Sequence, residues 1–335
     1  MTMTRRNVLL GFAVLFLTTL LVVLAITLNR PPAHPPLPNP NGYSDLIKAS
    51  ETVAGDVGNF QTFDRDGLHA LVSTNAEPLR VIRLGLTRQC LMPMDSALTN
   101  VAGMMSQLAD MKRLVQLLAA EGRLLEMDNR AADAANSYTE AIRFGNEMSR
   151  GGFLITRLVG IACESIGCHA LAMVTPKLNS QEARVVLAEL EKVDADHVTW
   201  AEVLRNERCF ARYQLRNTLN PIPWVVAWWQ SRQAMEKAEA KHRIIIAHER
   251  LLAAELALRC YQSEKAAVPA HLNELVTNYL AKVPQDPFTI QPLIYRSRGT
   301  NWLLYSLGPD GVDDGGRPAG RGWPAKGDIL FDSSW

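Results

Sequence analysis

Hydrophobic and polar positions divide the chain into four stretches of different character. Residues 8–28 are apolar almost without interruption, and no charged residue occurs among them. A proline-rich stretch follows, and from about residue 44 to 262 apolar residues recur at the three- and four-residue spacing of amphipathic helices. Beyond Gln262 come short runs rich in branched and aromatic residues, which are typical of strands. The pattern predicts a mainly α-helical protein with a small C-terminal α+β module.

The helical stretch contains several long helices. Residues 100–127 are rich in Leu, Met and Ala, and Asp128-Asn129 interrupts the pattern before a second helix at 130–150. A third helix at 153–174 is apolar on almost every side, and the charges and glycines that interrupt it favour a buried core helix over a second membrane span. Three further helices are expected: one opened by a capping box of Asn179 and Glu182, and two at about 195–217 and 224–262.

Two strand-like runs mark the C-terminal module. Residues 292–297 and 301–307 are rich in Ile, Leu, Tyr and Trp, and the short segment 298–300 between them contains a glycine. This arrangement indicates a β-hairpin. A short helix is expected at about 269–280, and GDILF at 327–331 is a candidate third strand.

The apolar run at 8–28 is long enough to cross a membrane. Its 21 residues would form a helix of roughly 31 Å, which matches a bilayer core of about 30 Å. Arg5 and Arg6 precede the run, so the positive-inside rule places the N-terminus in the cytoplasm. A cleaved signal peptide is the alternative, but the run exceeds the usual length of about 7–15 residues and no small-residue cleavage site follows Leu28. We therefore expect a single-pass anchor in the cell inner membrane, with the bulk of the chain periplasmic or extracellular.

A spacer separates this anchor from the folded part. Five prolines lie between residues 31 and 38, and such a composition favours an extended polyproline conformation. The spacer would hold the folded part clear of the lipid. The chain therefore divides into a membrane anchor (1–29), a linker (30–43), an α-helical domain (44–262) and a C-terminal module (263–335).

Composition narrows the choice of partners and of redox chemistry. Of the 335 residues 47% are hydrophobic and 21% charged, and the net charge of +1 gives no overall field that would attract nucleic acid. We therefore expect the membrane and an unidentified protein as partners, and no nucleic acid. The five cysteines are an odd number, and no CxxC pair occurs. We interpret them as buried apolar side chains.

Motifs for catalysis are missing from the sequence. No GxSxG, GxGxxG or P-loop occurs, and HERLL at 248–252 lacks the second histidine of an HExxH zinc site. Short polar clusters occur at Cys168-His169 and at Asp194, Asp196 and His197, and we interpret them as surface or helix-capping groups. We therefore expect a protein that is not an enzyme.

An acid-rich loop lies near the C-terminus, in YSLGPDGVDDGG at 305–316. The carboxylates of Asp310, Asp313 and Asp314 crowd into five positions, and their repulsion costs free energy unless a cation or water relieves it. Calcium takes six to eight hard oxygen ligands, which carboxylates and the carbonyls of a glycine-rich loop can supply. The alternative is a solvated loop whose acids are offset by neighbouring Arg and Lys side chains, and both interpretations stay open here.

Within the C-terminal module, the blocks ELVTNYL, VPQDPF, PLIY, YSLGPDG and GDI follow one another at suitable distances. Through these blocks about 60 of the 335 residues resemble the C-terminal part of the major pseudopilins of type II secretion systems. The resemblance implies a calcium ion that staples the small sheet, with Asp310 and Asp328 matching aspartates of the family's pattern. Asp313 and Asp314 fall where the family varies, and they complete the candidate metal ligands. The N-terminal run departs from the family, because Phe16 stands where its members have a glutamate.

Small and aromatic residues are regularly spaced in the helices at 100–127 and 130–150. Gly122 lies in the first helix, and Ala134, Tyr138 and Ala141 follow in the second. In this spacing the hairpin of about residues 115–146 resembles a degenerate tetratricopeptide-type repeat. The resemblance implies that the aromatic ring fills the gap between two closely packed helices, and that the helical domain is repeat-like.

These features predict a membrane-anchored, exported, non-catalytic scaffold or protein-interaction protein with a calcium-stabilised C-terminal module. One alternative is a component of a type II secretion or pilus-like assembly. Another is a hydrolase that uses carboxylates of the acidic loop. A further choice concerns Trp224, Trp228 and Trp229, which could lie at a lipid interface or in the core.

Overall fold

The computed structural model describes residues 16, 18–20, 35–94, 100–216, 222–320 and 325–332. Most of the run at 8–28 lies outside these residues, and so does the membrane anchor predicted there. The side chains of residues 214–216 and 222–231 also lie outside the description. They include Trp224, Trp228 and Trp229, for which the lipid interface and the core were the two alternatives. Among the described residues one helix, Leu154–Lys177, is long and apolar enough to cross a membrane, but 56% of its apolar window is buried inside the protein.

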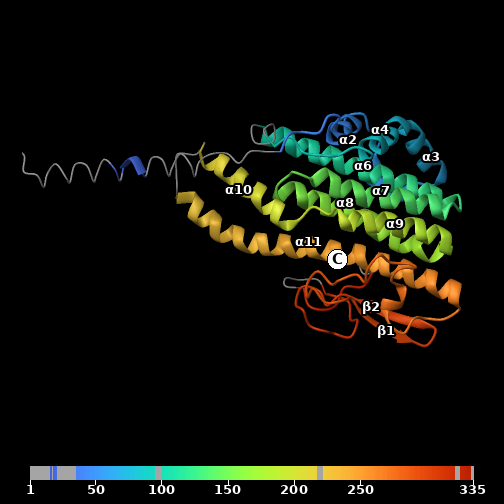
Figure 1. Ribbon diagram of the computed structural model, residues 1–335. Coiled ribbons are helices and arrows are strands. Elements are labelled where there is room, and N and C mark those ends of the chain that lie inside the picture. Colours follow the sequence, from blue (N-terminus) through green and yellow to red (C-terminus); the bar gives the residue numbers. More distant parts are fainter. Residues whose placement is uncertain are drawn as a thin grey trace, which may run out of the picture.

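Five long helices form the body of the molecule (Figure 1). α6 (Val101–Met127), α7 (Ala131–Ser149) and α8 (Leu154–Val174) lie beside one another, and α9 (Ser180–Ala195) packs against α7 and against α11 (Ile222–Lys265). Because α8 contacts α6, α7 and α11, it occupies the middle of this array. The mainly helical fold is confirmed, and the boundaries of these helices lie close to the predicted ones.

Four short helical elements, which precede α6 in the sequence, pack against it. They are α2 (Gly42–Ser50), the 3₁₀ helix η1 (Val57–Thr62), α3 (Arg65–Thr74) and α4 (Ala76–Leu86). All four contact α6, and α2 also packs against α4. Their apolar side chains join those of α6 and of one face of α7 in a hydrophobic cluster, so burial of these faces fixes the short helices in place.

Local chemistry explains where two of the helices begin and end. Asn129, which follows α6, has a φ of 57°, a left-handed conformation that asparagine adopts more readily than most residues. The capping box predicted at the start of α9 is present: the Asn179 side chain accepts hydrogen bonds from the N–H groups of Gln181 and Glu182, each at 3.0 Å. The Glu182 carboxylate accepts the N–H of Asn179 in return, at 2.9 Å.

Glycines allow the central helices to approach one another closely. A Cβ on Gly160 of α8 would lie 2.4 Å from the carbonyl oxygen of Gly145 on α7, and a Cβ on Gly145 would lie 2.5 Å from that of Gly160. A Cβ on Gly122 of α6 would lie 2.2 Å from the ring of Tyr138 on α7. The predicted contact between this small residue and this aromatic ring is therefore present.

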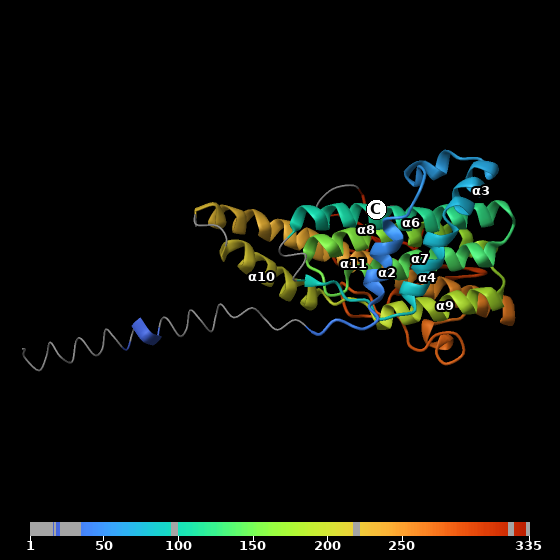
Figure 2. The same ribbon diagram turned by 90° about the horizontal axis from the view of Figure 1, so that it is seen from above.

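Helices α10 (Trp200–Arg216) and α11 form an arm at one end of the molecule (Figures 1 and 2). Residues 35–41 join the helical body toward the same end. The stacked rings of Phe153 and Phe210, with centroids 4.4 Å apart, hold α10 against the start of α8.

The C-terminal module contains the predicted β-hairpin. β1 (Ile294–Arg298) and β2 (Asn301–Tyr305) are antiparallel, with Ile294 opposite Tyr305 and Arg298 opposite Asn301. Two other expectations were wrong in detail. The helix expected at about 269–280 is only a 3₁₀ helix, η3 (Leu272–Leu275), and the segment 327–331 makes isolated bridges instead of a third strand.

The hydrophobic core extends into the C-terminal module, and the cysteines are buried as the sequence pattern predicts. A second hydrophobic cluster joins α7, α8, α9 and α11 to residues of the module, including Leu275, Leu304 and Ile329, so the core continues across the proposed boundary at 263. All five cysteines are free and buried. Burial raises the pKa of the Cys163 thiol to about 12, so it is an apolar core residue and not a reactive thiolate.

Candidate functional site

The acidic loop is held by hydrogen bonds from the protein itself. One oxygen of Asp313 accepts the hydroxyl of Tyr305 at 2.7 Å and the N–H of Gly315 at 2.9 Å, and the other lies 2.7 Å from a guanidinium nitrogen of Arg296. The hydrogen bond from Tyr305 lowers the pKa of Asp313, so this carboxylate is ionised. The cation that offsets it comes from β1 and was not foreseen among the basic residues near the loop.

Asp328 and Asp310 connect the loop to the C-terminal segment. Asp328 is completely buried, and its carboxylate accepts the N–H of Gly316 at 2.7 Å. Burial raises the pKa of Asp328. Asp310 accepts the N–H of Gly327 at 3.3 Å. The acidic loop and the C-terminal segment therefore each contribute one aspartate that binds the backbone of the other. The backbone nitrogen of Asp314 lies 3.5 Å from a carboxylate oxygen of Asp328.

The four aspartates do not converge on one point. Within the described residues, three carboxylate oxygens of this set do not come within 4.8 Å of one another. A calcium ion here would therefore need loop carbonyls or a rearrangement of the side chains, and calcium binding stays a prediction.

A buried polar cluster elsewhere in the molecule is organised around Arg157 on α8. Its Nε donates to Nδ1 of His242 on α11 at 3.0 Å, and its two terminal nitrogens bind both oxygens of Glu164 at 2.7 and 2.8 Å. The remaining N–H groups face the hydroxyl of Ser149 at 3.2 Å and Nε2 of His197 at 3.3 Å. Arg157 and Glu164 are both fully buried, and every donor of the guanidinium has an acceptor.

The partners of the two histidines fix their tautomers. His242 accepts a hydrogen bond from an arginine at Nδ1, so its proton is on Nε2. Nδ1 of His197 lies 3.2 Å from the carbonyl oxygen of Val198, which can only accept, so the proton is on Nδ1 and the lone pair of Nε2 faces the cluster. Burial and the charge of Arg157 lower the pKa of His242 to about 3 and that of His197 well below its usual value, so both rings are neutral.

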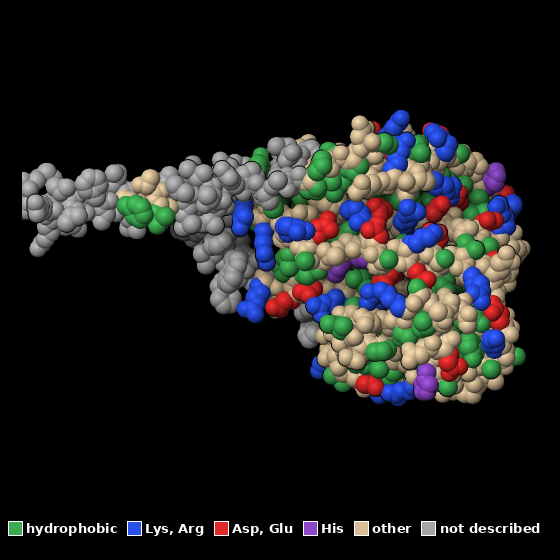
Figure 3. Space-filling view, in the orientation of Figure 1, with side chains coloured by type: hydrophobic (Ala, Val, Ile, Leu, Met, Phe, Trp, Pro, Cys, Tyr) green, Lys and Arg blue, Asp and Glu red, His purple; other side chains and the backbone are tan. Residues whose placement is uncertain are grey.

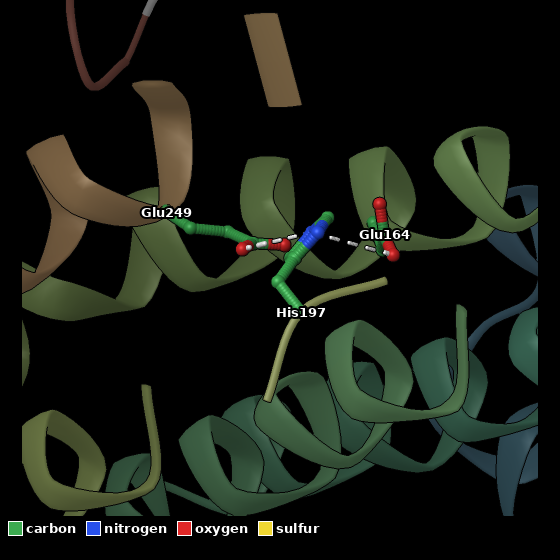
Figure 4. A group of neighbouring side chains, drawn as sticks. All are labelled: Glu164, His197 and Glu249. Carbon is green, nitrogen blue, oxygen red and sulfur yellow. Dashed lines mark ion pairs between the residues drawn. The ribbon is translucent and has the colours of Figure 1, made fainter. Parts of the chain in front are cut away.

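Glu249 on α11 completes the cluster from the other side. Its side chain is fully buried, and neither carboxylate oxygen has a hydrogen-bond partner among the described residues. One oxygen lies 3.6 Å from Nε2 of His197, and an oxygen of Glu164 lies 4.0 Å from the same nitrogen (Figure 4). Burial, and then the charge of Glu164, raise the pKa of Glu249 well above its usual value. Among the described residues, Glu164, His197 and Glu249 are the group whose geometry could hold a metal ion.

Sequence reasoning missed this cluster and misplaced one of its members. His197 was expected at the surface or in a helix cap, but its side chain is only 7% exposed and faces Glu164 and Glu249. Glu249 belongs to the HERLL segment, which lacks the second histidine of a zinc site on its own helix. The available signal was the pair of charges at 157 and 164 inside an apolar helix, because buried charges need partners that other elements must supply.

A surface pocket of about 660 Å³ lies where η1, α6, α7 and α8 meet. Its lining is largely apolar, and the side chains of Arg123, His169 and Lys177 are also part of it. Glu126 within it is already occupied, since it accepts hydrogen bonds from Lys177 at 2.8 Å and from the Tyr138 hydroxyl at 2.6 Å. The pocket is lined by Phe60, Gln61, Ala119, Arg123, Glu126, Tyr138, Ser165, Ile166, His169, Ala170, Met173 and Lys177.

Charges elsewhere on the surface are mixed. On the face shown in Figure 3, Lys and Arg side chains alternate with Asp and Glu over the described part of the body. Many charged side chains of the protein form ion pairs along or between helices, such as Arg83 with Glu140 at 3.0 Å and Arg250 with Asp194 at 2.7 Å.

No family model, no curated protein and no solved structure matches this chain. The resemblances to a pseudopilin module and to a tetratricopeptide-type hairpin therefore rest on the sequence blocks that carry them.

Proposed function

We propose that the protein is a membrane-anchored, exported scaffold that binds a partner protein and is not an enzyme. The observation that carries the proposal is the pocket between η1, α6, α7 and α8. Its volume of about 660 Å³ is in the range, roughly 300–1,000 Å³, of pockets that bury a drug-sized molecule, so it has room for apolar side chains of a partner helix or loop. The apolar side chains of the pocket would supply affinity for the partner, and its polar and charged side chains would fix the orientation of the bound segment.

The chemistry of the lining indicates what kind of segment would fit. Arg123, His169 and Lys177 line the pocket together with its apolar side chains, and Lys177 is already paired with Glu126. Met173, 62% exposed, offers a flexible apolar side chain that can adapt to different shapes. A partner segment with apolar anchors and an acidic residue beside them would complement this surface.

The arrangement of the helices also supports anchoring at one end. The α10–α11 arm and residues 35–41 lie toward the same end of the molecule, whereas the pocket lies along the body. A membrane attached through the N-terminal run would therefore face the arm and leave the pocket open to a partner.

A photocrosslinking amino acid at position 173 of the full-length protein tests the proposal in living cells. We expect a discrete adduct with another protein, and we expect Ala170→Trp, which fills the pocket, to reduce it at least tenfold. Val185→Trp adds the same bulk to α9, at a position 54% exposed and outside the pocket, and should leave the adduct unchanged. The proposal is wrong if no adduct forms, or if the adduct resists Ala170→Trp while the variant remains folded.

A further inference from the structure

The polar cluster between α8, α11 and the α9–α10 connection contains a carboxylate that no described residue satisfies. Neither oxygen of Glu249 has a hydrogen-bond partner in the described part of the chain, although the side chain is completely buried. Arg157 cannot serve it, because all five of its N–H groups already face Glu164, Ser149, His197 and His242. A buried carboxylate in this position is costly unless a cation or another donor fills the space in front of it.

We propose that Glu164, His197 and Glu249 bind one divalent metal ion of the zinc class, which clamps α8, α11 and the α9–α10 connection together. The site goes beyond the proposed scaffold function and does not depend on it. Figure 4 shows the two glutamates reaching from separate helices toward the imidazole of His197, which lies between them. The three ligand atoms all lie within 4.8 Å of one another.

The geometry is close to that of a four-coordinate site. Ligand atoms at roughly 2.0–2.1 Å from a tetrahedral metal are about 3.3–3.4 Å apart. Nε2 of His197 lies 3.6 Å from Glu249 and 4.0 Å from Glu164, so modest rotations of the side chains would close the site. A water molecule or a small anion would take the fourth position.

The chemistry of the donors selects the class of metal. One imidazole nitrogen with two carboxylate oxygens suits zinc and related borderline cations, whereas calcium and magnesium prefer sets made entirely of oxygen. The hydrogen bond from Nδ1 of His197 to the Val198 carbonyl turns the lone pair of Nε2 toward the site. Metal-binding histidines are usually held in this way by a backbone carbonyl or a carboxylate.

Arg157 has a defined role beside the metal. It binds both oxygens of Glu164 and so fixes the orientation of that carboxylate. Its contact with Nε2 of His197, at 3.3 Å, is the longest of its five hydrogen bonds, and it is the one that a metal at Nε2 would replace. The two carboxylates would offset the metal charge, and an anion in the fourth position would balance the charge of Arg157.

The test uses full-length protein in detergent, stripped with a chelator and then supplied with one equivalent of zinc. We expect about one zinc per chain after desalting, measured by plasma mass spectrometry, and a melting temperature several degrees above that of the stripped protein. Glu249→Gln and Glu249→Met keep the size of the side chain but remove the carboxylate ligand, and we expect both to lose the bound zinc and the shift.

Glu255→Gln is the matched control. Glu255 is also a buried glutamate of α11, but it binds Arg259 and Trp302 outside the cluster, so this variant should keep the zinc and the shift. The proposal is overturned if stripped wild-type protein takes up no zinc. It is also overturned if the two Glu249 variants retain as much zinc as wild type, since the metal would then be bound elsewhere.

Discussion

A fully buried arginine is tolerated when each of its N–H groups finds an acceptor, and Arg157 meets this condition. The guanidinium joins α8 to α7 through Ser149 and to α11 through His242, and it also reaches the α9–α10 connection at His197. Its ion pair with Glu164 lies within α8. Its net contribution is small when both charges are compared with apolar residues, but removal of one partner leaves the other charge buried alone.

Arg157→Met should therefore lower the free energy of unfolding by about 3–5 kcal/mol, measured with denaturant in the presence of a chelator so that no metal contributes. Arg157→Met combined with Glu164→Met should recover much of this loss, because no unpaired charge remains. Arg80→Met removes an arginine from an exposed ion pair with Glu77 and should change stability little. An Arg157 variant as stable as the Arg80 variant would contradict this account of the cluster.

At the scale of elements, the acidic loop and the segment around Asp328 depend on each other. Asp328 accepts the N–H of Gly316, and Asp310 accepts the N–H of Gly327, so each carboxylate holds the opposite strand of chain. We propose that calcium strengthens this contact by drawing both carboxylates and loop carbonyls together.

Full-length protein in detergent should then melt a few degrees higher in millimolar calcium than in a calcium chelator. Asp310→Ala or Asp328→Ala should abolish the difference, because each removes one candidate ligand. Asp66→Ala, which changes an exposed carboxylate on α3, should preserve it. If wild-type protein melts at the same temperature in both solutions, the loop is stabilised by its own hydrogen bonds, such as those of Asp313, and not by calcium.

The elements also show what the sequence could and could not predict. Periodicity predicted the bounds of α6 to α9 and α11 within a few residues. Apolar faces and helix ends depend on residues close together in the sequence, such as Asn129 after α6 and the N-cap Asn179 of α9. The prediction of a third strand at 327–331 was wrong, because a strand needs a partner along its length. In this segment Ile329 pairs with Ser306 and Asp328 pairs with Pro318, each as an isolated bridge.

The candidate metal site could not be predicted for a related reason. Glu164, His197 and Glu249 are spread over 86 positions of the sequence, and no local spacing connects them. Their meeting depends on how closely α8 packs against its neighbours, which in turn depends on contacts such as that of Gly160 with Gly145. The glycines and the charges of α8 are visible in the sequence, but the sequence does not show which helices pack against them.

For the whole molecule, the proposed orientation places everything after the N-terminal run on one side of the membrane. A reporter enzyme that is active only outside the cytoplasm should therefore be active when fused after residue 42 and when fused to the C-terminus. The same reporter fused after residue 6, before the run, should be inactive. Activity of the last fusion alone would reverse the orientation, and inactivity of all three would refute export.

Helix α11 links distant parts of the fold with a single stiff element. Its 44 residues span about 66 Å at the rise of an α-helix. One end forms the arm with α10, and the other carries the β-hairpin on a shared core. Because α11 also packs against α8 and α9 between these two ends, the arm and the hairpin belong to one continuous packed unit. If the arm faces a membrane, as proposed, a single helix would connect the membrane-facing end of the body to the C-terminal hairpin.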